Sequence, residues 1–559
     1  MDKKDRLINR RSVLKGAIGI GALASEAAWP AWWSAAQHIA THTVNPRAFG
    51  AKGDGVTRDT EALQKAIESC ASAGGGTVLV SPGTYLSGTL ELRSNITLEV
   101  QAGATILGSP DANDYFVPPD APPIVRALPG RHLLYALGAD NLTLRGPGVI
   151  DGHSSVFLGK GQPPPPPEDL WKGVYSAETV RIVRISPMVE LANCNNLLIE
   201  NITLQNAVGW TLRPSGCKTV IIRGVKVRNP LNASNADGID PTACEDALIT
   251  DCDVITGDDA ICLKGNNQYG GSTLSRNVTV SNCRVSTCCN GLKVGEEGGG
   301  DFENIVIKDC EVYSGDVPFN HRVISGIEVA LSSANRIDGI SFSNITMKNV
   351  RTPIYIRLQG RMSHEYSPAK GSVSNVHITG VRATGAILTS SITGQPGAPV
   401  QQISLSDVQI TTEEPGRDEW VGLSIPEKTN AYDEANMMGR FPSYGIYARH
   451  VKGLQLSNVS VKSTNGDPRP MLVCDDVQAL TVNGVSGTPS GPGHAFLDLR
   501  NVQTAVVRDN TAPAGSKIYA RISGNETHNI RFMNNDLHQA SQPIETAPDV
   551  PQGAVIQVG

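Results

Sequence analysis

Seven aspartates occur in one short stretch, residues 235–264, which reads NADGIDPTACEDALITDCDVITGDDAICLK, and four of them are candidates for chemistry. These four are Asp237, Asp240, Asp258 and Asp259. Neighbouring carboxylates resist joint ionisation, so at least one carboxyl of such a cluster keeps its proton at a higher pH than a free carboxyl does. A protonated carboxyl beside an ionised one is suited to general acid and base chemistry. Taken alone, an Asp-Asp pair is more often a solvated acidic turn, and it is the surrounding repeat that favours a catalytic role.

The composition favours a turn-rich β protein and gives no sign of nucleic-acid binding. The chain has 559 residues, of which 57 are glycine and 5% are aromatic. Its formal net charge is −6, whereas nucleic-acid-binding domains carry a strong basic excess. Nucleic acid is therefore not an expected partner.

A small unit recurs from about Asp140 to the end of the chain: a polar residue, a short alternating apolar run, Asn, Asp or Gly, and a second short run. Copies begin at Asn196, Lys218, Asp246, Asn277 and Asn304. A period of about 20–50 residues built from short strands is typical of a solenoid. The repeat predicts an all-β, right-handed parallel β-helix over residues 45–559, with catalytic coils at about 190–365 and C-terminal coils at 374–559. A β-propeller has a similar period but needs four strands per unit and more aromatic residues.

Two segments precede the repeat. Thr60 is suited to cap a helix over residues 61–73, with Leu63, Ala66, Ile67 and Cys70 on one face, and this helix would cover the open end of the solenoid. Residues 1–40 contain the sequence NRRSVLK at 9–15 and an apolar run at 16–24. This segment resembles a bacterial twin-arginine (Tat) signal peptide, which implies export to the periplasm or the medium without stable membrane insertion.

Eleven cysteines and three long interruptions remain. Cys252, Cys283 and Cys310 each stand two residues before a valine, and no histidines flank them, which favours a buried cysteine stack over a metal site. We expect no metal and no cofactor. The interruptions at 152–184 and 353–370 are expected to form walls of a binding groove, and the one at 413–447 is either a wall or a flexible loop.

The coil period places the aspartates together. Asp237 and Asp258 are separated by 21 residues, about one coil, so they should lie on adjacent coils and face the same side. Adjacent coils are about 4.8 Å apart. Asp259 can turn into the same cleft, and the three carboxyls would then converge.

Three segments resemble the polygalacturonase family, glycoside hydrolase family 28. They are residues 210–215 (WTLRPS), 235–240 (NADGID) and 256–264 (TGDDAICLK), and the segments at 49–55 and 80–85 match the opening of that superfamily. The resemblance covers about residues 45–365. It implies hydrolysis of a glycosidic bond with inversion, with Asp258 as the general acid and with Asp237 and Asp259 activating the attacking water. An inverting pair needs about 6.5–9.5 Å between its carboxyls.

Two positions depart from the family pattern. Asn290 stands where the family usually has the histidine of Gly-His-Gly, and residues 326–330 (GIEVA) stand where it has Arg-Ile-Lys. The cations that hold a galacturonate carboxylate are therefore replaced, and Glu328 would repel that carboxylate. A bacterial subgroup of polygalacturonase-like proteins has a similar pattern. That resemblance implies a substrate-binding set of Asp240, Lys264, Asn290, Lys293, Glu297, Glu328, Arg357 and Arg361.

The sequence leaves the substrate and two other functions open. Polygalacturonan and rhamnogalacturonan both fit a pectin-type polysaccharide or oligosaccharide hydrolase, which we expect to be a monomer. A polysaccharide lyase on the same scaffold would use an arginine base with calcium. A β-helix that binds glycans without cleaving them is the third alternative.

Overall fold

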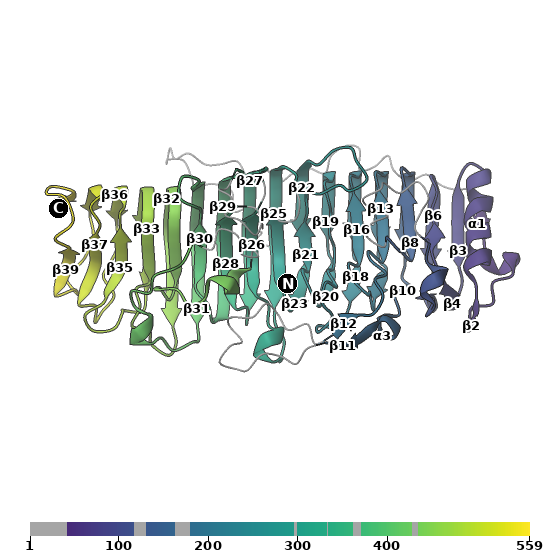
Figure 1. Cartoon of the computed structure of the whole chain (residues 1–559), viewed down its shortest axis with the longest axis horizontal. Helices are drawn as coiled ribbons and strands as arrows, with labels where there is room; N and C mark the ends of the chain where they lie inside the picture. The colour runs from purple at the N-terminus through teal and green to yellow at the C-terminus, as the bar shows by residue number, and fades with distance from the viewer. Residues whose placement is uncertain are drawn as a thin grey trace, which may run out of the picture. The chain divides into compact units, whose positions relative to one another are not determined.

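The computed structural model describes residues 42–116, 130–161, 179–295, 299–332, 334–360, 370–427 and 434–558 (Figure 1). The predicted leader at 1–40 lies outside these ranges. Residues 40–559 form one compact unit.

Each coil of this unit contributes three short strands. In one coil these are β14 (Asn195–Glu200), β15 (Thr203–Gln205) and β16 (Leu212–Ser215), which we call its A, B and C strands. Each pairs in parallel with the equivalent strand of a neighbouring coil, as β14 does with β9 and β17. The chain is thus a right-handed parallel β-helix, as predicted, and its parallel ladders exclude the antiparallel blades of a propeller.

The strands fall into three columns. The A column contains β1 (Thr43–Val44), β3 (Gly76–Val80), β6 (Ile96–Val100), β9 (Asp140–Arg145), β14, β17 (Lys218–Arg223), β19 (Glu245–Thr250), β22 (Ser275–Ser281), β36 (Gln503–Arg508), β38 (His528–Met533) and β40 (Val555–Val558). The B column contains β2 (Asp54–Arg58), β4 (Gly83–Ser87), β7 (Ala104–Gly108), β10 (Val149–Asp151), β15, β18 (Lys226–Arg228), β20 (Asp253–Thr256), β23 (Arg284–Thr287) and β34 (Ser486–Gly487). The C column contains β5 (Leu90–Glu91), β8 (Leu134–Leu137), β13 (Val189–Ala192), β16, β21 (Ile261–Leu263), β24 (Asn290–Gly295), β26 (Ser325–Leu331), β28 (Thr352–Leu358), β30 (Ser390–Thr393), β35 (Ala495–Arg500), β37 (Ile518–Ser523) and β39 (Gln542–Thr546).

Six longer strands bend through more than one column. β25 (Phe302–Tyr313), β27 (Arg336–Lys348), β29 (Ser372–Ala386) and β31 (Val400–Thr412) run through A and B. β32 (Ile446–Ser463) runs through all three columns, and β33 (Leu472–Asn483) runs through C and A. A separate antiparallel pair, β11 (Leu158–Lys160) and β12 (Thr179–Arg181), lies within the first predicted interruption.

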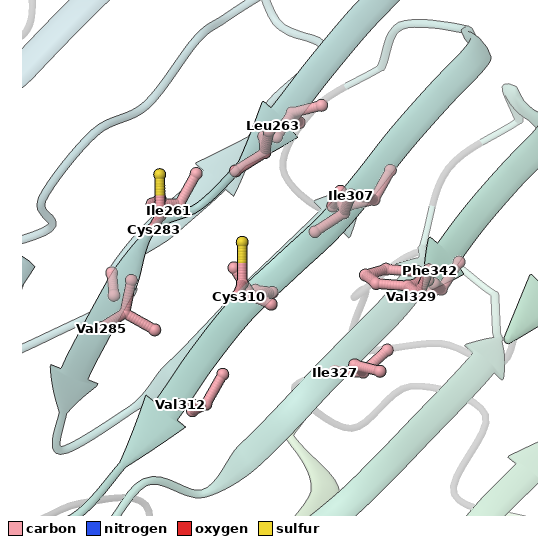
Figure 2. Packing of buried hydrophobic residues seen from close by; sticks show 14 of the residues in the cluster. Ile261, Leu263, Cys283, Val285, Ile307, Cys310, Val312, Ile327, Val329 and Phe342 are labelled. Atoms are coloured by element: carbon pink, nitrogen blue, oxygen red, sulfur yellow. The ribbon is translucent and has the colours of Figure 1, made fainter. Parts of the chain in front are cut away.

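The core is a set of aliphatic rows that run from coil to coil. Ile222, Ile249, Val280 and Ile307 follow one another in register and are fully buried. Burying one such side chain contributes about 1.5–3 kcal/mol. Cys283 and Cys310 form a second buried row on neighbouring coils, next to the row of Val285 and Val312 (Figure 2). All eleven cysteines are buried and unbridged, which confirms the predicted cysteine stack.

Asparagine and aspartate side chains form a hydrogen-bonded row at the start of several A strands. Asn277 has a φ of 55° and Asn304 a φ of 52°, in the left-handed region that asparagine tolerates better than most residues. The side-chain amide of Asn304 donates to Asn277 Oδ1 at 2.8 Å, and that of Asn277 donates to Asp246 Oδ1 at 2.8 Å. The repeat start predicted at Lys218 is one residue early, because Thr219 carries the equivalent positive φ of 57°.

Helices are short and lie outside the ladders. They are α1 (Thr60–Ser72), α3 (Ser154–Phe157), η2 (Pro46–Phe49), η3 (Ala112–Asp114), η5 (Phe319–His321), η6 (Asp418–Trp420) and η7 (Ala435–Met438). α1 buries the predicted face against the first strands, but Asp59 rather than Thr60 precedes the helix. Among the described residues, no helix is long and apolar enough to cross a membrane.

The three corners of a coil differ in how much chain they accept. Two residues separate A from B in coils such as those at 201–202, 224–225, 251–252 and 282–283. The corners that border the C strand vary from two residues, as at 193–194 and 216–217, to long excursions: 152–188 and 413–445 connect B to C, and 359–371 connects C to A. The second predicted interruption therefore begins later than expected, because Thr352–Leu358 form β28. Whether these corners form groove walls stays a prediction.

Replacing Asn277 tests the asparagine row. Asn277→Ala should lower the free energy of unfolding by about 1–2 kcal/mol, because alanine is strained at positive φ and both amide bonds are lost. Asn277→Gly loses the same bonds without the strain, and it should be less destabilising. Equilibrium urea unfolding measures both. Equal losses for the two variants would show that backbone conformation at this corner contributes nothing.

Candidate active site

Parallel pairing brings Asp237 and Asp259 side by side. Ile239 pairs with Ile261 across adjacent coils, and Gly238 N donates to Asp259 O at 2.8 Å. Asp258 directly precedes Asp259 at the corner that leads into β21. Three of the candidate residues are buried: Asp237, Asp258 and Asp259 are 2%, 6% and 4% exposed. The adjacent-coil placement predicted from the spacing is confirmed, with Asp259 rather than Asp258 in register with Asp237.

Backbone amides fix the carboxylate of Asp258. Its Oδ2 accepts from Asn235 N at 2.8 Å, and its Oδ1 accepts from Asp259 N at 2.9 Å. The hydroxyl of Thr287 donates to the backbone carbonyl of Asp258. This corner is therefore held from the coil before and from the coil after.

Asp237 lies in an environment that opposes its ionisation. Burial raises its pKa well above the usual value, and the charges of Asp240, Asp258 and Asp259 raise it further. The ammonium of Lys264, 2.9 Å from Asp237 Oδ2, acts in the opposite direction but does not outweigh burial. The other oxygen, Oδ1, is buried without a hydrogen-bond partner among the described residues. Asp237 thus keeps a proton to higher pH than a free carboxyl does.

Asp259 has the opposite bias. Burial acts against its ionisation, but Lys293 and Lys264 outweigh burial and lower its pKa. Lys293 Nζ lies 3.1 Å from Asp259 Oδ2, and the amide of Asn290 donates to Asp259 Oδ1 at 2.8 Å. Neighbouring carboxyls with pKa values shifted in opposite directions supply an acid and a base at one site.

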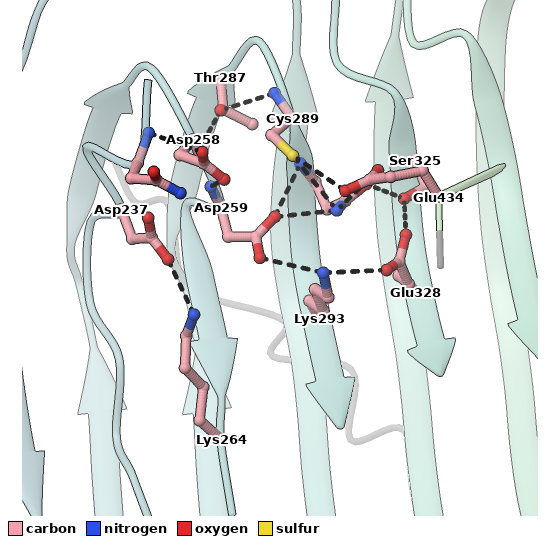
Figure 3. A network of polar contacts seen from close by, with 12 residues as sticks. Asp237, Asp258, Asp259, Lys264, Thr287, Cys289, Lys293, Ser325, Glu328 and Glu434 are labelled. Carbon is pink, nitrogen blue, oxygen red and sulfur yellow. Dashed lines mark hydrogen bonds and ion pairs between the residues drawn. The ribbon is translucent and has the colours of Figure 1, made fainter. Parts of the chain in front are cut away.

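A closed ring of polar contacts supports Asp259 (Figure 3). Lys293 Nζ also lies 3.2 Å from Glu328 Oε1, and both side chains are fully buried. Ser325 Oγ lies 2.6 Å from Glu328 Oε2 and 2.5 Å from Asn290 Oδ1. The ring returns to Asp259 through the Asn290 amide, so Lys293 and Asn290 hold both oxygens of this carboxylate.

The sequence-based reasoning missed Ser325 and Glu434. Ser325 pairs in register with Asn290, so a coil-by-coil alignment of the repeat could have found it. Glu434 comes from the 413–445 corner, and its carboxylate accepts from Asn290 Nδ2 at 3.3 Å and from Cys289 Sγ at 3.5 Å. No repeat or motif in the sequence connects Glu434 to the aspartates.

The predicted substrate-binding residues surround the aspartates but are themselves buried. Asp240, Lys264, Asn290, Lys293, Glu328 and Arg357 are between 0% and 5% exposed. Asp240 adds to the charge that raises the pKa of Asp237. Arg357 lies on β28 and contacts Gln359 Oε1 at 3.0 Å and Glu427 O at 3.1 Å. Glu297 and Arg361 lie outside the described residues.

One group of potential metal ligands occurs among the described residues. Ligand atoms of Asp258, Asp259 and Cys289 lie within 4.8 Å of one another. Burial, together with the charges of Glu434 and the aspartates, raises the pKa of the Cys289 thiol well above its usual value. A thiol must lose its proton to bind a metal, and Lys293 already contacts Asp259 Oδ2. The chemistry of this group therefore does not favour a metal ion.

Comparison with known families decides the classification. The profile of glycosyl hydrolases family 28 matches residues 125–428, more than half of the chain and all of the residues from Asp237 to Arg357. The chain belongs to glycosyl hydrolases family 28. Residues 43–111 match a second profile, described as rhamnogalacturonase A/epimerase, pectate lyase-like.

Relatives of this family 28 enzyme share about a quarter of its residues. A probable polygalacturonase of Vitis vinifera is 25% identical over 66% of this chain and 74% of its own length. An endo-polygalacturonase of Pectobacterium parmentieri is 25% identical over 62% of this chain and 82% of its own.

Solved structures with the same fold include two exopolygalacturonases. That of Thermotoga maritima has a TM-score of 0.54 and 25% identity over 67% of this chain and 88% of its own. The family 28 exopolygalacturonase of Yersinia enterocolitica has a TM-score of 0.57 and 18% identity over 81% of this chain and 79% of its own.

Replacing Lys264 should change the pH dependence of this glycosyl hydrolase. Lys264→Met removes a cation that lowers the pKa values of Asp237 and Asp259. Both carboxyls should then hold protons to higher pH, so the acidic limb of the plot of kcat/KM against pH, which reports ionisation of these carboxyls, should move to higher pH. Measuring kcat/KM on the glycan substrate across the pH range tests this.

Lys226→Met is the matched control, because Lys226 is exposed on β18 in a neighbouring coil. It should leave the acidic limb in place. A profile for Lys264→Met that coincides with the wild type, or that moves to lower pH, would contradict the electrostatic role of Lys264.

Proposed function

We propose that this family 28 enzyme hydrolyses a glycosidic bond of pectin-type polysaccharide with inversion at the anomeric carbon. The observation that carries the proposal is the convergence of three buried carboxyls: Asp237 and Asp259 lie side by side on adjacent coils, and Asp258 is fixed next to them by backbone amides. Asp258 protonates the leaving oxygen, and Asp237 and Asp259 activate the attacking water. The names of the relatives, which are polygalacturonases, support the pectin-type substrate.

Electrostatic coupling between Asp237 and Asp258 is compatible with these roles. The charge of Asp258 raises the pKa of Asp237, so the two carboxyls are coupled and ionising one hinders ionisation of the other. When Asp258 is protonated, as the general-acid role requires, its charge no longer raises the pKa of Asp237, and Asp237 then ionises more easily beside Asp259. Burial of the site strengthens each of these electrostatic interactions, because little water is present to screen them.

Two substrates fit the pattern, polygalacturonan and rhamnogalacturonan. Residues 326–330 (GIEVA) stand where polygalacturonases usually have Arg-Ile-Lys. Lys293 offsets the charge of Glu328 at 3.2 Å, but the same ammonium is shared with Asp259. Residues 326–330 therefore contribute a carboxylate and no cation, and this favours rhamnogalacturonan as the second candidate, because part of that chain is neutral.

Wild-type protein should release reducing ends from at least one of these two polymers, with inverted configuration in the first product seen by NMR. Asp258→Asn and Asp259→Asn should each lower kcat by about 10²–10⁴-fold, because each removes an acid or base group. Asp316→Asn, at an exposed position, is the control and should leave kcat unchanged. An ultraviolet-absorbing unsaturated product would instead identify a lyase, and binding without product release would identify a glycan-binding protein.

We also propose that residues 1–40 direct export through the twin-arginine route and that the exported enzyme is a monomer. The twin arginines Arg10 and Arg11 before an apolar run support this assignment. A reporter that must fold before export, fused after residue 40, should reach the periplasm of a bacterial host. Replacing both arginines with lysine should retain it in the cytoplasm. Export of the lysine variant at the wild-type level would contradict the proposal.

A further inference from the structure

The 413–445 corner is built into the fold at both of its ends. Near its start, Glu414 forms an ion pair with Arg440. The guanidinium carbons of Arg440 and Arg469 lie 4.8 Å and 5.2 Å from the centre of the Trp420 ring, at cation–π distance. Arg469 in turn pairs with Asp467 at 2.6 Å on the following coil. The described parts of the corner, residues 413–427 and 434–445, are therefore held by the scaffold.

This corner also packs against the outer side of the C column. Ala435 belongs to a buried cluster with Cys289, Ile324, Ala330 and Tyr355, which come from three successive coils beyond Asp259. The preceding residue, Glu434, is 1% exposed. It lies beyond residue 428, where the match to family 28 ends, so the family pattern does not account for it.

The carboxylate of Glu434 constrains one particular amide. Asn290 Nδ2 donates to Asp259 Oδ1 at 2.8 Å and to Glu434 Oε2 at 3.3 Å, while Asn290 Oδ1 lies 2.5 Å from Ser325 Oγ. Rotating the amide by half a turn would place its oxygen against two carboxylates, which is unfavourable because neither can donate when ionised. Glu434 thus acts together with Asp259 to keep the NH₂ group of Asn290 directed at the two carboxylates.

The direction of this amide matters for the chemistry. A hydrogen bond donated to a carboxylate stabilises its ionised form, and Asp259 must be ionised to activate water. Glu434 contacts the same side-chain amide that donates to Asp259, so Asn290 connects the two carboxylates.

We propose that Glu434 is a positioning residue for Asp259, acting through the Asn290 amide, and that the 413–445 corner is a working part of the active site. This inference rests on the proposed hydrolase function. It gives the corner a role in the reaction itself in place of the wall or flexible loop expected from the sequence.

Replacing the acceptor of Glu434 tests the proposal. Glu434→Met fills a similar volume without an acceptor, so the Asn290 amide loses its constraint and Asp259 is protonated at higher pH. We expect kcat to fall about tenfold with little change in KM, and the acidic limb of kcat/KM to move to higher pH. Glu434→Gln keeps a carbonyl oxygen that can accept the same bond, and it should restore most of kcat without the upward shift of the limb.

A double-mutant cycle with Asn290→Ala separates positioning from general stability. If Glu434 acts through Asn290, adding Glu434→Met to Asn290→Ala should change kcat by no more than about twofold. Glu419→Met, at an exposed position of the same corner, is the matched control and should behave as the wild type.

The possible failures are distinguishable. An undiminished loss in the Asn290→Ala background, or a Gln variant as impaired as the Met variant, would reduce Glu434 to a structural support of the corner. A Glu434→Met enzyme with the wild-type pH profile would overturn the inference about Glu434. If Asp259→Asn were inactive in the same assay, the proposed hydrolase function would still stand. Full activity of Asp259→Asn would overturn the proposed function itself.

Discussion

Parallel backbone pairing between successive coils is the constraint on which the whole molecule depends. It fixes neighbouring coils at about 4.8 Å and places equivalent residues side by side. In the core this register lines up Ile222, Ile249 and Val280. On the C column the same register lines up carboxylates that would otherwise separate. The fold thus uses one set of hydrogen bonds both to build its core and to hold like charges together.

Holding like charges together requires compensation, and the lysines supply it. Six carboxyls meet in and around the site: Asp237, Asp240, Asp258, Asp259, Glu328 and Glu434. Lys264 and Lys293 lie among them, each within hydrogen-bond or ion-pair distance of a different aspartate. Breaking a buried ion pair by removing one partner costs about 3–5 kcal/mol. The pKa values of the two aspartates therefore differ because their neighbours differ. Lys293 and Asn290 contact Asp259, whereas burial dominates at Asp237.

The repeat made much of this arrangement accessible from the sequence. Alternating apolar residues and positive-φ asparagines recur with each coil, so the β-helix and the meeting of Asp237 with the Asp258–Asp259 pair followed from spacing. The burial of Lys293 and Glu328 did not follow, because it depends on what covers the C column. Glu434 could not be found at all: it lies in a corner with no periodicity, and only the folded chain brings it to Asn290. The position of a residue within a coil can thus be predicted from nearby sequence. The segment that packs over a coil cannot be predicted in this way.

The unequal corners of the coil bear on how such an enzyme can acquire a new specificity. A corner beside the C strand can lengthen without interrupting the A and B ladders. The main free-energy cost is then the entropy of closing a longer loop. That entropy grows only logarithmically with length, by about 0.6 kcal/mol for each doubling. A solenoid of this kind can therefore exchange the loops around its catalytic carboxyls in single genetic steps while its core sequence stays unchanged. The two-residue corner between A and B has no such freedom, and selection should act there mainly on stability.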